Sequence, residues 1–227
     1  MIFDSSYVIV LPGILLALYA QWKVHSTFQR FSQVPTVAGR TGAEVAVELL
    51  RRRGVRDVTI EPTDGLLADH YDPRTKTLRL SPAVYGSASV AAVGVAAHEC
   101  GHALQHHEGY TPLALRSAIV PVATLGTQAA LILFMIGLFA SLRPLMDLGI
   151  LLFLGYIAFA LVTLPVEFDA SRRAVAALQR EGLVTSTEAD GTRQVLNAAA
   201  LTYVAAAAMA VLQLVRLVAL RNMRDHE

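Results

Sequence analysis

The stretch SASVAAVGVAAHECGHALQHH, residues 87–107, decides how the rest of the chain is interpreted. Small apolar residues dominate it and Gly109 follows it, so we expect one mostly buried helix from about Ser87 to His107. Inside it, HECGH at residues 98–102 has the pattern H-E-x-x-H. Residues four apart share a helix face, so His98 and His102 can bind one metal ion, while Glu99 projects differently.

This pattern predicts a catalytic zinc site. Zinc with three protein ligands keeps a fourth position open and makes water there acidic. We therefore expect Glu99 to act as general base in the hydrolysis of peptide bonds. The competing interpretation is a pair of core histidines held by hydrogen bonds, because unpartnered polar groups in a buried helix would be costly. Cys100 points to another face and is expected to be a packing residue.

A third ligand is required, and four residues are candidates. His106 lies eight residues beyond His98, about 12 Å along the helix axis, so one ion cannot reach both. His70 is possible, although a lone histidine is more often a local hydrogen-bonding residue. Glu167 is favoured because it follows an apolar segment at a predicted membrane boundary. A solvated glutamate in a first helical turn would look the same, and Asp169 is the substitute.

The composition points to a membrane protein. Of the 227 residues, 54% are hydrophobic and only 16% are charged, against roughly a quarter charged in soluble domains. Mean hydropathy is +0.48. The net charge of +1 gives no reason to expect nucleic acid as a partner. A single cysteine excludes an intramolecular disulfide.

Four stretches are long enough to cross a bilayer, which takes about 20 mainly apolar residues. They are residues 5–22, 117–142, 148–166 and 194–215. We interpret the first as a retained anchor rather than a signal peptide. The alanine-rich fourth has the weakest signal, and a buried soluble helix is its alternative. The expected fold is a mainly α membrane protein, with about four transmembrane helices, a zincin-like HExxH helix and a small β-hairpin.

The remaining segments, about 23–116 and 167–193, form the expected catalytic region of a single membrane-embedded unit covering residues 1–227. Thr41 and Glu44 have the spacing of a capping box at a helix start. Strand candidates are residues 58–60, 66–71 and 75–80, the last two joined by a turn at Asp72-Pro73. A further helix is expected from Glu167 to Arg180, after Pro165. Because the second and third spans form a hairpin, His98 and Glu167 should lie on the same membrane side.

Several segments together resemble a known family. They are HYDP at 70–73, LRLS at 78–81, the HECGH helix and EFDAS at 167–171. They are similar to a bacterial family of neutral zinc membrane metallopeptidases, and more distantly to the CAAX prenyl protease and heat-shock membrane protease group. The resemblance implies Zn2+ as cofactor and Glu167 as the third ligand. Ser171 stands where the distant group has Asp, so a contact of that Asp must be absent or supplied otherwise.

The resemblance also implies how substrate binds. Sites of this gluzincin-like type hold the peptide backbone along an exposed strand edge, by β-augmentation. Here that strand would be Thr77, Leu78, Arg79 and Leu80. A second electrophilic residue often stabilises the transition state. His70 is our candidate for that role, with Tyr71 and Tyr110 as alternatives.

The expected partners are a peptide or membrane-protein substrate and the lipid bilayer, and the oligomeric state is left open. Most Lys and Arg lie in the region from Lys23 to Arg116, which predicts an active site facing the cytoplasm. The carboxyl-terminal arginines argue the other way if the fourth segment crosses. Two rival hypotheses are a non-catalytic, zinc-stabilised membrane scaffold or adaptor, and a metal-dependent hydrolase of a non-peptide substrate.

Overall fold

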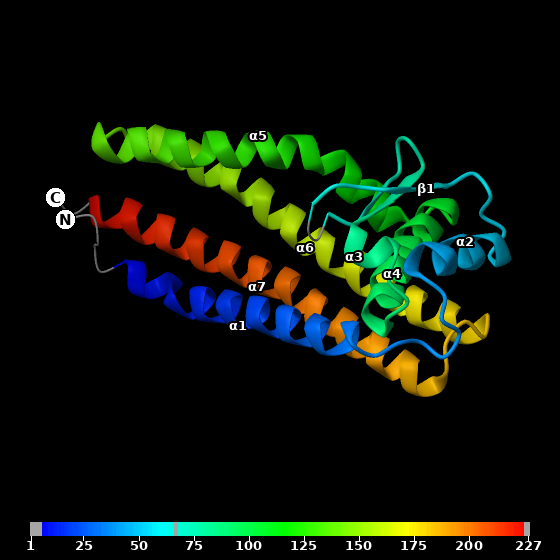
Figure 1. The fold of residues 1–227 in the computed structure, drawn as a ribbon. Coiled ribbons are helices and arrows are strands. Elements are labelled where there is room, and N and C mark those ends of the chain that lie inside the picture. Colours follow the sequence, from blue (N-terminus) through cyan, green and yellow to red (C-terminus); the bar gives the residue numbers. More distant parts are fainter. Residues whose placement is uncertain (1–5, 66–67, 225–227) are drawn as a thin grey trace. The chain divides into compact units, whose positions relative to one another are not determined.

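The computed structural model describes residues 6–65 and 68–224 and is mainly helical. It contains α1 (Tyr7–Ser32), α2 (Gly42–Arg52), β1 (Thr59–Pro62), β2 (His70–Asp72), β3 (Thr77–Leu80), α3 (Pro82–Tyr85), α4 (Val90–His107), α5 (Thr111–Phe139), α6 (Arg143–Arg180) and α7 (Ser186–Arg224) (Figure 1). The expected fold class is confirmed: long apolar helices accompany a small sheet and a helix that carries the HECGH segment.

Three helices, α1, α6 and α7, are long and apolar enough to cross a membrane. Helix α5 bends by 44° between Thr111–Pro121 and Ala123–Phe139, and it forms a fourth span if its two parts are counted together. All four predicted spans therefore lie mainly on helices. The exceptions are Ser5, which lies outside the described residues, Ser6, which precedes α1, and residues 140–142, which follow the end of α5. Alanine-rich α7 is long and apolar enough to cross a membrane, although its segment had the weakest signal in the sequence.

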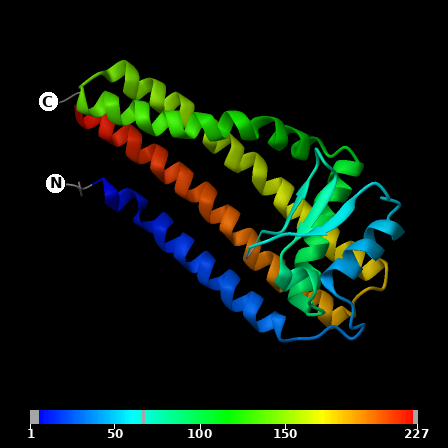
Figure 2. The same cartoon turned by 45° about the horizontal axis from the view of Figure 1, so that its top comes forward.

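The chain divides into two compact units. The first consists of residues 1–21, 115–164 and 202–227, and the second of residues 22–114 and 165–201. In the first unit, parts of α1, α5, α6 and α7 run alongside one another (Figures 1 and 2). Glycines allow close packing there: a Cβ on Gly149 of α6 would lie 2.7 Å from the Ala130 carbonyl oxygen of α5. Close approach through small residues is how membrane helices gain packing energy.

The second unit contains α2, the sheet, α3 and α4, together with parts of α1, α6 and α7. Within this unit the sheet, α2 and α4 lie against one another (Figure 2). The largest apolar cluster lies among these elements, with Leu49, Leu78, Leu80 and Leu178 fully buried. The capping box is confirmed: Thr41 accepts from the Glu44 N–H, and the Glu44 carboxylate accepts from the Thr41 N–H.

The sheet has the strand order β1-β3-β2. The predicted hairpin is confirmed, because β2 pairs antiparallel with β3. Its first strand was expected at 66–71 and is observed at His70–Asp72; residues 66–67 lie outside the described residues. The predicted strand at 58–60 is observed at Thr59–Pro62, where it pairs with β3 in the parallel direction. This arrangement corrects one expectation: β3, residues 77–80, is the central strand and both of its edges are occupied. It has no free edge for a substrate strand.

A second correction concerns Pro165. We expected a helix break there, but α6 continues through it to Arg180. Proline lacks the N–H that would bond the carbonyl of the preceding turn, so the helix loses one hydrogen bond at this point. Interactions with α4 hold the segment just beyond the proline. One of them is a hydrogen bond from Gln105 to the Val166 carbonyl oxygen.

Candidate metal centre

Side chains from α4 and α6 converge in the second unit. Glu167 Oε2 lies 3.2 Å from His98 Nε2 and 3.7 Å from His102 Nε2. The two imidazole rings stand edge to face, with their centres 4.8 Å apart. All three side chains are largely buried: His98 is 14% exposed, His102 is 10% exposed and Glu167 is 1% exposed. Their donor atoms all lie within 4.8 Å of one another, so they could hold one metal ion.

The close approach of α4 to α6 depends on Gly101, between Cys100 and His102. A Cβ built on Gly101 would lie 2.4 Å from the Ala170 carbonyl oxygen, which no real Cβ tolerates. With hydrogen there instead, α6 lies against α4, and Glu167, one turn before Ala170, reaches both imidazoles. Gly101 therefore permits the close approach of α6 to α4.

The other ring nitrogen of each histidine has a partner. His98 Nδ1 lies 3.1 Å from Ser171 Oγ, and His102 Nδ1 lies 3.0 Å from Gln105 Oε1. If each Nε2 binds a metal, each Nδ1 carries the proton and donates it to that oxygen. Such partners determine the tautomer and the ring orientation of metal-ligating histidines. Ser171, which replaces the Asp of the distant group, therefore supplies a contact to His98.

Gln105 is a residue that the sequence analysis missed. It is fully buried on α4 and bridges to α6. Its Nε2 donates to the Val166 carbonyl oxygen at 2.8 Å and to Asp169 Oδ2 at 3.0 Å, while its Oε1 faces His102. One amide therefore connects a histidine of the cluster with the backbone beside Glu167. The available signal was a glutamine three residues after His102, on a helix that the sequence predicts to be mostly buried.

An ion-pair network surrounds this bridge. Asp169 accepts from Gln105 and from Arg172 and Arg173. Arg173 also pairs with Glu108, the C-cap residue of α4. Asp169, our substitute third ligand, is thus engaged with arginines and an amide, while Glu167 lies with the histidines. The network joins the carboxyl end of α4 to α6 on the side of the cluster where Gln105 lies.

Negative charge surrounds His102. Burial opposes its protonation, but hydrogen bonding to Glu167 and the charges of Glu99 and Glu167 outweigh burial and raise the pKa of His102 above its usual value. Glu99 is itself buried. The same charges would attract a metal cation. Burial, with a smaller contribution from Glu99, raises the pKa of the Cys100 thiol, whose Sγ contacts the Ala46 carbonyl oxygen.

Other predicted site residues lie elsewhere. His70 is exposed on β2, and its Nδ1 lies 2.8 Å from the Ala68 carbonyl oxygen. The Tyr71 hydroxyl lies 2.8 Å from His106 Nδ1, and the Tyr110 ring lies under the Arg173 guanidinium. Within the described ranges, the cluster of possible metal ligands contains His98, His102 and Glu167. It does not include His70 or His106.

Comparison with known proteins agrees with this geometry. Residues 6–222 match the family described as "Putative neutral zinc metallopeptidase". The chain is 47% identical over 203 residues to the "Putative membrane protease YugP" of Bacillus subtilis (strain 168), covering 89% of this chain and 90% of that protein. No solved structure matches. The resemblance drawn from the sequence is confirmed, and the chain belongs to this family of neutral zinc metallopeptidases.

Proposed function

We propose that the chain is a zinc-dependent membrane endopeptidase in which Glu99 is the general base. The observation that carries the proposal is the buried cluster of His98, His102 and Glu167, with their donor atoms within 4.8 Å of one another. Glu99 lies on the same helix, between the two histidines. The family and the curated relative support proteolysis as the activity.

The donor set suits zinc. Two imidazoles and one carboxylate are a common ligand set of catalytic zinc in peptidases. Bonds of about 2.0–2.1 Å in a tetrahedral arrangement separate ligand atoms by roughly 3.3 Å. Two of the separations here, from Glu167 Oε2 to the histidine nitrogens, are 3.2 and 3.7 Å. Small side-chain movements would therefore suffice for the three residues to hold one ion.

The chain's own residues have distinct roles in this proposal. Ser171 and Gln105 keep the proton of each histidine on Nδ1, so that both Nε2 atoms are available as ligands. When bound, zinc polarises the scissile carbonyl and makes water a competent nucleophile at neutral pH. The Glu99 carboxylate accepts the proton of that water and passes it to the departing amine. The water oxygen forms the new bond to the carbonyl carbon, and the C–N bond breaks.

For the substrate backbone we propose the edge of β2 in place of β3. Since β3 is central, the strands at the sheet edges are β1 and β2. Of these two, β2 contacts the metal-site helix α4, and Tyr71 on β2 reaches His106 of that helix. An extended peptide added to β2 would extend the sheet by main-chain hydrogen bonds. Residues 77–80 would then support the pairing strand without contacting the peptide backbone.

The decisive experiment compares Glu99→Gln with the wild-type protein in detergent or nanodiscs. We expect Glu99→Gln to keep its zinc and its thermal stability while losing cleavage of casein or of an unfolded membrane protein by at least about 100-fold. The matched control is Glu61→Gln, which removes an exposed carboxylate on β1 and should cleave normally. Cleavage by Glu99→Gln at the wild-type rate would refute the role of Glu99.

The same experiment separates the rival functions. A non-catalytic scaffold predicts no zinc-dependent cleavage by the wild-type protein, and unfolding of the second unit when zinc is removed. A hydrolase of a non-peptide substrate predicts a zinc-loaded, Glu99-dependent protein that leaves every protein substrate intact. Either result would overturn the proposed function.

We also propose that the active site faces the cytoplasm. The support is the concentration of Lys and Arg between Lys23 and Arg116, since basic residues near membrane ends are retained on the cytoplasmic side. An epitope inserted at Gly39, which is exposed and has open space around it, tests this directly. The epitope should be inaccessible in intact cells and accessible in inverted vesicles, and the opposite pattern would refute the orientation.

A further inference from the structure

Asp169 acts on His102 through another side chain. Its carboxylate is buried, and its Oδ2 accepts a hydrogen bond from Gln105 Nε2 at 3.0 Å. The oxygen of the same amide, Gln105 Oε1, lies 3.0 Å from His102 Nδ1. We propose that Asp169 is a positioning residue of the metal centre, which fixes the direction of the Gln105 amide and thereby keeps the proton of His102 on Nδ1. The inference rests on the proposed zinc site and adds the residue that prepares one of its ligands.

The amide of Gln105 has one end that donates and one end that accepts. Its nitrogen has two N–H groups, whereas its oxygen only accepts. The nitrogen lies 2.8 Å from the Val166 carbonyl oxygen and 3.0 Å from Asp169 Oδ2, and neither oxygen has a hydrogen to donate. Turning the amide over would bring three oxygen atoms together in a buried space with no hydrogen between them. The nitrogen therefore faces α6 and the oxygen faces His102.

The direction of the amide determines the tautomer of His102. An oxygen that only accepts requires a hydrogen on the atom opposite it, so in the neutral ring Nδ1 carries the proton and Nε2 keeps its lone pair. His102 Nε2 lies 3.7 Å from Glu167 Oε2 and is therefore the nitrogen on the side of the proposed metal. The partner of His98 Nδ1 is the Ser171 hydroxyl, a group that can accept or donate. The protein thus determines the tautomer of His102 more strictly than that of His98.

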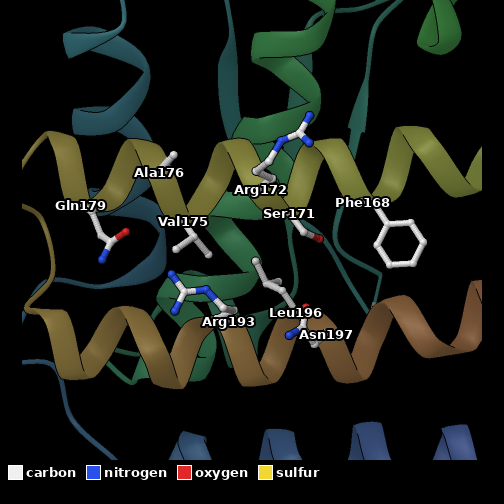
Figure 3. Close-up of a pocket in the computed structure, with 9 residues that line it drawn as sticks. All are labelled: Phe168, Ser171, Arg172, Val175, Ala176, Gln179, Arg193, Leu196 and Asn197. Carbon is white, nitrogen blue, oxygen red and sulfur yellow. The ribbon is translucent and has the colours of Figure 1, made fainter.

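Two arginines hold the Asp169 carboxylate in place. Arg172 donates to Oδ1, and Arg173 donates to Oδ2, the oxygen that Gln105 also reaches. Arg173 is 25% exposed and also pairs with Glu108, the C-cap residue of α4. The Arg172 side chain is 78% exposed and extends from α6 on the side away from α7 (Figure 3). The Oδ2 side of the carboxylate is therefore anchored between α4 and α6, while the partner on its Oδ1 side can turn into solvent.

A double-mutant cycle on zinc affinity tests whether Asp169 acts through Gln105. The four proteins are the wild type, Asp169→Ala, Gln105→Leu and the double variant, each purified in detergent as the full chain. Asp169→Ala should raise the zinc dissociation constant about tenfold, because only the Val166 carbonyl oxygen then remains to orient the amide nitrogen. In the Gln105→Leu background the same change should raise it less than about twofold, since the amide on which Asp169 acts is gone.

Asp169→Asn separates the hydrogen bond from the charge. The asparagine oxygen can replace Oδ2 beside Gln105 and Arg173, while its NH2 group takes the position beside exposed Arg172. Because a neutral oxygen still accepts from the amide, we expect a zinc affinity within about threefold of the wild type. Asp190→Ala is the matched control: it removes another pair of Asp and Arg three residues apart, on α7, and it should bind zinc normally.

Nuclear magnetic resonance adds a signature that a loss of packing alone would not give. In zinc-loaded protein with nitrogen-15 in its histidines, each ligand histidine should show a ring N–H signal from the nitrogen that does not bind the metal. Gln105→Leu and Asp169→Ala should shift the same one of these signals, and Asp190→Ala should shift neither. If Asp169→Ala does not fold, Asp169→Ser replaces it throughout, because the serine oxygen is one bond nearer the backbone and falls short of the Gln105 amide.

An independent role of Asp169, as a metal ligand or in helix packing, predicts that Asp169→Ala has equal effects in the two backgrounds. Equal effects would overturn the proposal, as would an unchanged zinc affinity in Asp169→Ala or an equally large loss in Asp169→Asn. None of these measurements depends on proteolysis. A wild-type protein that binds zinc but gives equal effects refutes only the role of Asp169, whereas a wild-type protein without tight zinc also overturns the proposed function, so the two failures are distinguishable.

Discussion

Replacing Gln105 by leucine should weaken zinc binding without unfolding the protein. Gln105 is fully buried, and its Oε1 lies 3.0 Å from His102 Nδ1. Leucine has a similar size but leaves the buried Nδ1–H without the acceptor that the amide supplies. The two other partners of the amide are less affected, because Val166 lies in the continuous helix α6 and Asp169 keeps its hydrogen bonds to Arg172 and Arg173. The lost hydrogen bond therefore affects mainly His102.

The magnitude follows from that single missing acceptor. A buried donor left unsatisfied costs about 1–3 kcal/mol. Removing an outer partner of a metal-ligating histidine lowers metal affinity by about 10- to 100-fold, which corresponds to roughly 1.4–2.7 kcal/mol. The cost of the unsatisfied donor and the expected loss of zinc-binding free energy therefore agree. Both apply to the zinc-bound form, in which His102 must keep its proton on Nδ1. The metal-free protein can adjust because the ring can also share a proton with Glu167.

The assay is competition for zinc between the detergent-solubilised protein and a chromogenic chelator. We expect the dissociation constant of Gln105→Leu to rise about 10- to 100-fold, with its far-UV circular dichroism unchanged. Gln29→Leu is the control, because Gln29 is exposed on α1 and remote in sequence from the cluster. A folded Gln105→Leu protein with wild-type zinc affinity would refute the role assigned to Gln105.

Three other predictions follow from packing and ionisation. Gly101→Ala should destabilise the protein by about 1–3 kcal/mol in thermal unfolding, because the new Cβ would meet the Ala170 carbonyl oxygen at 2.4 Å. The control Gly155→Ala places its Cβ in open space and should not destabilise the protein. Equal melting temperatures of the Gly101→Ala and wild-type proteins would contradict the packing of α6 against α4. Cys100 is fully buried with a raised pKa, so a thiol reagent should label it only after denaturation, and rapid native labelling would contradict its burial. Burial, with the charges of Asp57 and Asp72, raises the pKa of Tyr71 to about 12. The neutral Tyr71 hydroxyl therefore contributes stability that is complete below the pKa of an unfolded tyrosine, about 10, and that is lost as the pH rises through the folded pKa. In an alkaline absorbance titration, Tyr71→Phe should therefore lose a tyrosine that ionises near pH 12, and an unchanged titration would contradict the shift.

Features that depend on near neighbours in the chain were predictable. The two histidines share a face because four residues span about one helical turn. The capping box at Thr41 needs only the spacing to Glu44, and the β2–β3 hairpin needs only a short turn between two strands. The four apolar segments were visible because membrane spans require long runs of apolar residues.

Features that depend on distant contacts were not predictable from one sequence. The parallel pairing of β1 with β3 makes β3 central, and no local pattern distinguishes a central strand from an edge strand when both are short. Pro165 remains inside α6 although proline usually marks a helix boundary. Gln105 could not be recognised as a bridge from the sequence, since its two partners on α6, Val166 and Asp169, lie more than 60 residues away.

The most direct test of the zinc site is the coordination of the bound metal in the wild-type protein and in Glu167→Ala. Zinc analysis combined with X-ray absorption at the zinc edge counts the ions and identifies the ligand atoms. We expect one zinc per chain, bound by two imidazole nitrogens together with oxygen, and a large loss of zinc in Glu167→Ala. Tight zinc retained by Glu167→Ala, or a sulfur ligand from Cys100, would contradict the assignment of His98, His102 and Glu167.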